Sequence, residues 1–305
     1  MAIAHVDQWA GTDVRLADVE RAISLLRERD ANDEDGPDLR TSVLTHVVWA
    51  PRRWRTAVEE VMAGLAERHP SRAIVLFPEP ESARDALDAE VALESYDVKG
   101  LCRHVAAEVI RIHLHGPRAS APASVVSPLL VTDLPVFLRW RGQPPFGTPP
   151  FEQLLGVTDR VIVDSTEWDE LPAAYAQLGR CFDRAAVSDI AWSRTLRWRR
   201  EVAALWPGIA EVRRVRVRAP RALGLLLAGW LRARLRRDLE VVLEAHDLLS
   251  EIDLDGRPVE PPPGEAKTPS DLLSDELEVY GRDRVYEQAA LAAVAFGANG
   301  VTAAR

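Results

Sequence analysis

Short apolar segments alternate with helical segments between residues 42 and 165, and this alternation constrains the fold more than any other feature. Residues 42–50 (SVLTHVVWA) and 72–77 (RAIVLF) are β-branched and apolar, which is typical of strands buried on both faces. Between them, Pro51 begins a helix in which apolar residues recur at helical spacing. A strand, a helix and a strand within about forty residues predict a parallel sheet.

The same pattern continues to residue 166 and predicts one α/β domain. We expect further strands at residues 90–96, 109–115, 136–140 and 160–165, and helices at residues 124–130 and 151–155. Residues 40–166 therefore predict an N-terminal α/β domain with an open, mostly parallel sheet. Ahead of it, residues 1–39 hold a helix at residues 15–29 and an acidic linker, because like charges repel one another there.

The remaining residues predict a helical connector and a second, smaller α/β domain, and 305 residues suit two domains. The connector at residues 167–208 is expected as two helical pieces, the second with Ser188 as its N-cap. In the domain at residues 209–305, the alternation EVRRVRVR predicts a half-buried strand with Val215 and Val217 facing inward. Its later elements are a helix at residues 220–235, strands at 239–245 and 248–254, and helices at 271–278 and 284–296.

Charge and apolar content exclude several classes of protein. The net charge is −9 at pH 7, which argues against a surface coated with positive potential for nucleic acid. All but two of the 38 basic residues are arginine, which points to a GC-rich coding sequence rather than to a binding chemistry. The longest apolar stretch, residues 222–231, is about half of the ~20 residues that cross a membrane. The N-terminus lacks the features of a secretory signal, so we expect a cytoplasmic protein that binds neither nucleic acid nor membranes.

No motif of a known catalytic chemistry follows the predicted strands. The sequence has no G-x-G-x-x-G dinucleotide fingerprint, no G-x-x-x-x-G-K-[ST] phosphate loop, no nucleophile elbow and no H-E-x-x-H zinc motif. These absences predict a chain that is not an enzyme and holds no cofactor. Cys102 and Cys181 are too few for a disulfide framework, and we expect free thiols.

Histidines and arginines suggest two binding sites, each with a structural alternative. His113 and His115 share one face of a strand and are placed to meet a metal, but no carboxylate occupies a matching position, so we expect no metal site. The arginine-rich residues 194–237 suit a phosphate-bearing or acidic partner, or form a solvated face paired with acidic residues, the interpretation that we favour. Trp192, Trp198 and Trp206 are interleaved with these arginines at helical spacing, which is more typical of a core than of base stacking.

Two junctions between elements add candidate residues. His69, Pro70 and Ser71 connect a helix to the strand that begins at Arg72. Pro70 is expected to end the helix, and Ser71 or Arg72 to bind its loose carbonyl groups. Alternatively, Arg72 anchors an anion or a partner carboxylate.

The second junction is a sharp turn from a helix into a strand. Asp133 and Pro135 form this turn, and Asp133 is expected to cap it. Arg139 and Trp140 lie at the carboxyl end of the strand that follows, the edge where ligands bind in open parallel sheets. Both residue types are enriched at protein interfaces, so this edge is a candidate partner surface.

Five segments together resemble the glucose-6-phosphate dehydrogenase assembly protein family, OpcA. They are residues 69–72 (HPSR), 124–140 (SVVSPLLVTDLPVFLRW), 160–165 (RVIVDS), 188–194 (SDIAWSR) with Trp198 and Arg199, and, more weakly, 226–231 (LLAGWL) with 273–290. The resemblance spans roughly residues 40–290 in the family's order and spacing. The segment between Asp238 and Asp271 is shorter than the family's pattern.

The resemblance implies a non-enzymatic helper that binds glucose-6-phosphate dehydrogenase. Such a helper promotes the active oligomer of the dehydrogenase or raises its apparent affinity for glucose 6-phosphate, supporting the oxidative pentose phosphate pathway. We place Arg72, Trp140, Trp192, Arg194 and Trp198 on the partner-binding surface or in support of it. The cysteines through which some family members are controlled do not map onto this chain, so redox control is not inferred.

Two other hypotheses stay open. The first is a sugar-phosphate-binding sensor or small-molecule enzyme that uses the carboxyl edge of the sheet. The second is a nucleic-acid binder that uses residues 194–237, which salt-dependent retention on DNA would identify. The sequence does not fix the oligomeric state of the chain.

Overall fold

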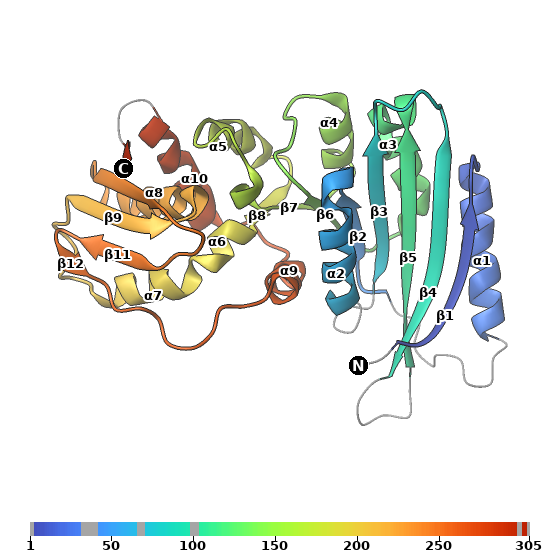
Figure 1. Ribbon diagram of the computed structural model, residues 1–305, viewed down its shortest axis with the longest axis horizontal. Coiled ribbons are helices and arrows are strands. Elements are labelled where there is room, and N and C mark those ends of the chain that lie inside the picture. Colours follow the sequence, from blue (N-terminus) through green and yellow to red (C-terminus); the bar gives the residue numbers. More distant parts are fainter. Residues whose placement is uncertain (1–2, 32–41, 66–70, 98–103, 298–300, 304–305) are drawn as a thin grey trace. The chain divides into compact units, whose positions relative to one another are not determined.

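The computed structural model describes residues 3–31, 42–65, 71–97, 104–297 and 301–303 (Figure 1). It contains an eight-stranded sheet in the order β1-β4-β5-β3-β2-β6-β7-β8 and a five-stranded sheet in the order β12-β11-β9-β10-β13. The predicted α/β class, with a larger and mostly parallel sheet and a smaller second sheet, is confirmed.

The strands of the larger sheet are parallel at its centre and antiparallel at one side. Their bounds are β1 (Ile3–Gly11), β2 (Thr45–Trp49), β3 (Arg72–Glu79), β4 (Leu87–Asp97), β5 (His104–His115), β6 (Val136–Trp140), β7 (Arg160–Val163) and β8 (Ala186–Asp189). Strand β2 pairs in parallel with both β3 and β6, and β3 pairs in parallel with β5. Strand β4 runs antiparallel to β5 and β1. Strand β1 was not predicted, because its polar residues lie at the edge of the sheet rather than in its core.

The central strands are buried on both faces, as their uninterrupted apolar sequence predicted. Every residue of β2 and β6 is buried. Helix α2 (Arg55–Leu65) covers one face: Val58 packs with Trp54 and Met62 against a cluster that includes Val48 and Phe77. The spacing of four residues along α2 puts these side chains on one stripe. Burial of each such aliphatic side chain stabilises the fold by roughly 1.5–3 kcal/mol.

The order of the strands reverses between β2 and β6. From β2 the chain adds β3 and then β5 on one side, and afterwards returns to add β6 on the opposite side of β2. Segments after β5 supply η2 (Gly116–Ser120), α3 (Pro122–Val126) and η3 (Ser127–Leu129), and α4 (Pro149–Leu155) follows β6. The carboxyl ends of β2 and β6 are therefore adjacent, which is the position where open α/β sheets bind ligands.

The chain forms two compact units. The first contains residues 1–161 and 269–278, and the second contains residues 162–268 and 279–305, so the division falls within β7. The sequence-based boundaries after residues 39, 166 and 208 stay a prediction. In the first unit, α1 (Leu16–Ala31) confirms the predicted N-terminal helix, whereas most of the predicted acidic linker lies outside the described residues.

A late segment of the chain belongs to the first unit. Helix α9 (Pro269–Leu277) packs against α2, far from it in sequence. Nη2 of Arg160 lies 3.4 Å from Oε2 of Glu276, and both side chains are buried. A buried charge pair is costly to break, because removing one partner leaves the other uncompensated. This pair ties α9 to the first residue of β7.

The second unit contains the smaller sheet. Its strands are β9 (Arg214–Ala219), β10 (Glu240–Ala245), β11 (Glu251–Leu254), β12 (Arg257–Pro258) and β13 (Val301–Ala303). Val215 and Val217 are buried, which confirms the predicted alternation of β9. The apolar helix α8 (Arg221–Leu235) joins β9 to its parallel neighbour β10. Gly229 of α8 allows close packing against α10 (Arg284–Ala293), because a Cβ atom there would lie 2.2 Å from the carbonyl oxygen of Ala289.

The predicted helical connector holds more elements than expected. It contains η4 (Ser165–Glu167), α5 (Ala173–Leu178), η5 (Gly179–Cys181), strand β8, α6 (Ile190–Arg194) and α7 (Leu196–Ala204). The prediction of Ser188 as N-cap was wrong: Asp189 caps α6 by accepting a hydrogen bond from the backbone N–H of Ala191. The four residues of β8 are too few and too polar for the sequence to predict a strand, although three of them are buried.

Candidate functional site at the ends of β7 and β8

Two neighbouring strands of the larger sheet, β7 and β8, each end at a carboxylate. Asp164 follows β7 and accepts hydrogen bonds from the backbone N–H and the hydroxyl group of Thr166. Nη1 of Arg194, at the end of α6, lies 2.8 Å from both carboxylate oxygens of Asp164. The Arg194 side chain is 31% exposed, whereas that of Asp164 is buried. The pair therefore presents a fixed guanidinium group to solvent.

Asp189 is the fully buried centre of the site. Its Oδ1 accepts hydrogen bonds from the backbone N–H groups of Ala191 and Ser165, at 2.9 and 3.0 Å. Its Oδ2 accepts a hydrogen bond from the hydroxyl group of Tyr286 at 3.3 Å. One side chain thus joins β8, α6, the segment after β7, and α10.

Burial changes the ionisation of this centre. Loss of solvation raises the pKa of Asp189 from 3.8 to about 7, and the negative charge of Asp164 acts in the same direction. The pKa of Tyr175 is raised well above 10 by its own burial and by Asp189. Its hydroxyl group lies 3.0 Å from Oγ of Ser165, and the Ser165 side chain also hydrogen-bonds the carboxylate of Asp189. These buried side chains form one hydrogen-bonded scaffold.

Trp192 and Arg199 extend the scaffold along α6 and α7. The indole N–H of Trp192 donates to Oδ2 of Asp283 at 2.9 Å, while Oδ1 of Asp283 caps α10. The Arg199 guanidinium lies 3.4 Å from the centre of the Trp192 ring. Burial lowers the pKa of Arg199 to about 10, against the opposing effect of Asp283, so the group stays cationic at neutral pH. The hydrogen bond to Asp283 at its edge and the cation–π contact with Arg199 on its face therefore fix the indole ring of Trp192.

The structure divides the five predicted partner-binding residues by exposure. Trp192 and Trp198 are buried in the second unit, and Arg72 and Trp140 are buried in the first. Trp140 is 2% exposed and stacks on Trp49 with ring centres 4.8 Å apart. Of the five residues, Arg194 has the accessible side chain. The other four are placed to support a surface rather than to form it, and their role in binding stays a prediction.

Arg72 lies in a buried ion network of the first unit. Its Nε is 2.8 Å from Glu108, and its Nη1 donates to the carbonyl oxygen of Leu129 at 2.7 Å. Arg27 binds the second oxygen of Glu108 at 2.5 Å. Burial alone would raise the pKa of Glu108, but the two arginines outweigh it and hold that pKa below its ordinary value. Arg72 thus anchors a carboxylate of its own chain.

The predicted structural residues are partly accounted for. His69 and Pro70 lie outside the described residues, and Ser71 is buried beside Arg72. Asp133 adopts a left-handed backbone conformation with φ of 66°, which confirms a sharp turn before Pro135 and β6. Asparagine and aspartate tolerate this conformation better than most residues do.

His113 and His115 share a face of β5, as predicted, and both approach Glu79 of β3. Nδ1 of His113 is 3.4 Å and Nδ1 of His115 is 3.1 Å from that carboxylate, and Asp88 lies 2.9 Å from Nε2 of His115. Within the described part of the chain, no three such side chains are placed to hold a metal ion. Cys181 is buried, and Cys102 lies outside the described residues.

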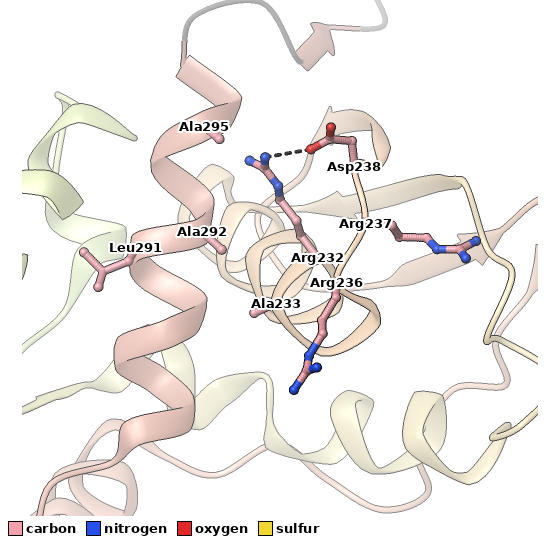
Figure 2. Close-up of a pocket in the computed structure, with 8 residues that line it drawn as sticks. All are labelled: Arg232, Ala233, Arg236, Arg237, Asp238, Leu291, Ala292 and Ala295. Carbon is pink, nitrogen blue, oxygen red and sulfur yellow. Dashed lines mark hydrogen bonds and ion pairs between the residues drawn. The ribbon is translucent and has the colours of Figure 1, made fainter.

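The arginine-rich segment forms several ion pairs within its own unit. Arg216 lies 3.3 Å from Glu244 and 2.5 Å from Glu251, in agreement with the solvated-face interpretation. A surface hollow of about 510 Å³ lies at the end of α8. It is lined by Arg232, Ala233, Arg236, Arg237, Asp238, Leu291, Ala292 and Ala295. Figure 2 shows Arg232 bonded to Asp238, with Arg236 and Arg237 pointing away from one another, so the guanidinium groups do not converge.

Sequence reasoning missed the centre of the scaffold. Asp164, Asp189, Tyr175 and Tyr286 belong to no catalytic or binding motif. A usable signal exists for Asp164, because it directly follows the apolar segment VIV at residues 161–163, whereas Asp189 follows only the short segment AVS. Side chains at the carboxyl ends of neighbouring strands meet at one edge of a sheet. The two tyrosines are brought in by helices and give no local signal.

In this two-unit α/β chain, the polar centre around Asp164 and Asp189 stabilises the fold and leaves the guanidinium group of Arg194 partly exposed. Comparison with known proteins shows which proteins the chain is similar to. Residues 63–180 match the family model described as glucose-6-phosphate dehydrogenase subunit N-terminal domain, of the OpcA assembly family. The matched residues span the end of α2 through η5 and include Arg72, Trp140 and Asp164.

Two curated relatives carry the provisional name OxPP cycle protein OpcA. One, from Nostoc punctiforme, is 26% identical over 208 residues, which cover 60% of this chain and 44% of the relative. The other, from a Synechocystis species, is 23% identical over 185 residues, which cover 56% of this chain and 38% of the relative. The match thus spans less than half the length of either relative. Together these findings agree with the predicted resemblance to the OpcA family.

Among the described residues, no helix has the length and apolar character needed to cross a bilayer.

Proposed function

We propose that this chain is a non-enzymatic assembly factor that binds glucose-6-phosphate dehydrogenase and promotes its active oligomer in the cytoplasm. The observation that carries the proposal is the family match over residues 63–180, whose description names that dehydrogenase. The names of the two relatives refer to the OxPP cycle and agree with a role in the oxidative pentose phosphate pathway.

The physical requirement on such a factor is differential binding. A protein that adds no chemistry raises activity only by preferring the competent state of its partner over the incompetent one. Moving the partner from 1:99 to 99:1 needs about 5.5 kcal/mol of preference. An interface of about 1,600 Å² supplies that through a few aromatic and arginine anchors.

Arg194 is our candidate anchor for that interface. Asp164 fixes its guanidinium group while a third of the side chain stays accessible, so little conformational freedom is lost on binding. Trp192 of α6 and Trp198 of α7 are buried in the same unit, and Arg72 and Trp140 are buried in the first unit, so we assign these four residues to the packing that supports the surface. Trp206, at 63% exposure, offers an accessible aromatic side chain beyond the end of α7.

The test is dehydrogenase kinetics with and without the purified chain, together with size-exclusion chromatography of the mixture. We expect a complex, a shift of the dehydrogenase to a larger oligomer, and a changed dependence of rate on glucose 6-phosphate. Unchanged kinetics together with separate elution would refute the proposal. Turnover of glucose 6-phosphate by the chain alone would refute its non-enzymatic character.

A further inference from the structure

The end of helix α8 forms a surface hollow that the candidate site at β7 and β8 does not use. Its volume is about 510 Å³, and every residue that lines it belongs to the second unit. Figure 2 shows Ala233 on the α8 side, and Leu291, Ala292 and Ala295 on the side of α10 and the turn η6 (Val294–Gly297). Hollows of roughly 300–1,000 Å³ with an apolar lining are typical of sites that bind other molecules.

Three arginines surround this apolar lining, and two of them form ion pairs with exposed acidic residues. Arg232 is bonded to Asp238 at 2.7 Å, and Arg237 is bonded to Glu211 at 3.1 Å. The side chains of Asp238 and Glu211 are 91% and 83% exposed. Exposed ion pairs contribute little stability, so carboxylates of a binding partner can replace these two acidic residues.

Arg236 is the third cation of the hollow. It is exposed and has no acidic partner among the described residues. Arg236 ends α8 in a left-handed backbone conformation with φ of 53°. Glycine is the usual residue at such a helix end, because the Cβ atom of any other residue is strained there. The arginine therefore costs stability at this position, while its guanidinium group is accessible without the loss of an internal ion pair.

An exposed apolar segment borders the hollow. Leu205 and Trp206, which are 46% and 63% exposed, directly follow α7. Successive hydrogen-bonded turns within residues 207–212 keep the chain compact from there to Glu211. Because Glu211 is bonded to Arg237 of the hollow, Leu205 and Trp206 lie within two turns of its rim.

The charges and their directions indicate the kind of partner. The chain has a net charge of −9, whereas residues 232–240 hold four arginines and two acidic residues. A small anion such as phosphate requires donors that converge on it, but Arg236 and Arg237 point away from one another (Figure 2). Separate cations around an apolar hollow match a protein surface on which carboxylates surround an apolar side chain. Tryptophan and arginine are also the residue types that contribute most at protein interfaces.

We propose that the hollow, together with Leu205 and Trp206, binds an acidic surface segment of glucose-6-phosphate dehydrogenase. An apolar side chain of that segment occupies the hollow, its carboxylates pair with the three arginines, and Trp206 packs against the partner beside it. We call this region the α8-end surface. The proposal rests on the proposed assembly function and adds a second contact, distinct from Arg194, within the same unit.

A matched pair of variants tests whether the hollow, rather than overall charge, binds the dehydrogenase. Arg236→Gln and Arg234→Gln each remove one exposed cation at neighbouring positions, but Arg236 lines the hollow and Arg234 does not. Biolayer interferometry with the purified dehydrogenase, at constant ionic strength, measures the affinity of each full-length variant. We expect Arg236→Gln to weaken binding about tenfold and Arg234→Gln to change it by less than about twofold. Equal losses in the two variants would overturn the proposal.

Two further variants separate binding from folding. Arg236→Gly relieves the left-handed conformation, so its thermal midpoint should equal or exceed that of the unmodified chain, while binding weakens about tenfold. Ala295→Trp fills the hollow from an exposed position and should weaken binding about tenfold or more with an unchanged thermal midpoint. Full affinity in Arg236→Gly and Ala295→Trp would overturn the proposal.

The unmodified chain distinguishes failure of this proposal from failure of the assembly function. If it binds and activates the dehydrogenase and all the variants do so equally well, the α8-end surface is refuted and the assembly function stands. If the unmodified chain does not bind the dehydrogenase, both are refuted. Sedimentation velocity of the chain alone tests a second copy as the occupant. Self-association that Arg236→Gln abolishes, with unchanged binding of the dehydrogenase, would also overturn the proposal.

Discussion

Replacing Asp189 with asparagine should remove a specific part of the pH dependence of stability. The substitution keeps the oxygen that accepts from Ala191 and Ser165, but it abolishes ionisation of the buried centre. The groups that face Asp189 are Asp164 with its partner Arg194, the hydroxyl groups of Ser165 and Tyr286, and the phenol of Tyr175. Of these, the carboxylate of Asp164 adds to the burial that disfavours a charged Asp189.

The magnitude follows from the raised pKa. The unfolded chain releases the Asp189 proton near pH 4, whereas the folded chain keeps it until about pH 7. Between those values the folded state binds more protons than the unfolded state, so the free energy of unfolding falls as the pH rises. Above about pH 7 both states have released the proton and this dependence ends. Between pH 5 and pH 8 the loss amounts to roughly 2–3 kcal/mol.

Urea unfolding at a series of pH values measures this directly. The unmodified chain should lose roughly 2–3 kcal/mol more stability than Asp189→Asn between pH 5 and pH 8, in the second unit. Asp247→Asn, which removes an exposed carboxyl of the same unit, is the control and should follow the unmodified chain. Parallel pH profiles for the unmodified chain and Asp189→Asn would refute the assignment of Asp189 as the group that titrates.

Three further predictions follow from single contacts. Glu108→Gln leaves Arg72 buried without its carboxylate and should lower the free energy of unfolding by about 3 kcal/mol at neutral pH. Because the pKa of Glu108 is lowered in the folded chain, the variant should also lose less stability than the unmodified chain below pH ~4.5. Chemical unfolding at pH 7 and pH 3.5 measures both effects. Gly229→Ala should lower the free energy of unfolding by at least about 2 kcal/mol, because its methyl group meets backbone atoms of α10. In the control Gly281→Ala the added methyl group meets no atom, and the free energy of unfolding should change by less than about 0.5 kcal/mol. Equal thermal midpoints of the two variants would contradict this prediction. Arg194→Gln should weaken binding of the dehydrogenase about tenfold or more in a pull-down titration, and unaltered binding and activation would remove Arg194 from the interface.

The sequence predicted those elements whose pattern is dictated by burial. Continuous apolar residues in β2 and β3, and alternation in β9, follow directly from strands with two buried faces or one. Strand β8 was not predicted, because four residues are too few to show the alternation or the apolar run of a strand. The scaffold depends on Asp189, the last residue of this strand. An N-cap oxygen is supplied equally well by serine or aspartate, so the sequence alone did not choose between residues 188 and 189.

The candidate site was harder to predict than the fold. Trp192 and Trp198 are buried, as their helical spacing predicted, but the same prediction was wrong for Trp206, which lies beyond the end of α7 and is exposed. Periodicity therefore distinguishes core from surface only where the helix continues. The stacking of Trp49 on Trp140 needs the pairing of β2 with β6, which no local pattern encodes. Sites formed by side chains from distant segments become visible only in the folded chain.

The most direct test of the assembly function is sedimentation velocity of glucose-6-phosphate dehydrogenase with increasing amounts of this chain, with activity measured on the same samples. We predict a heavier dehydrogenase species that contains the chain and grows in proportion to the gain in activity. A dehydrogenase that sediments unchanged and works at the same rate at every ratio would contradict the central claim.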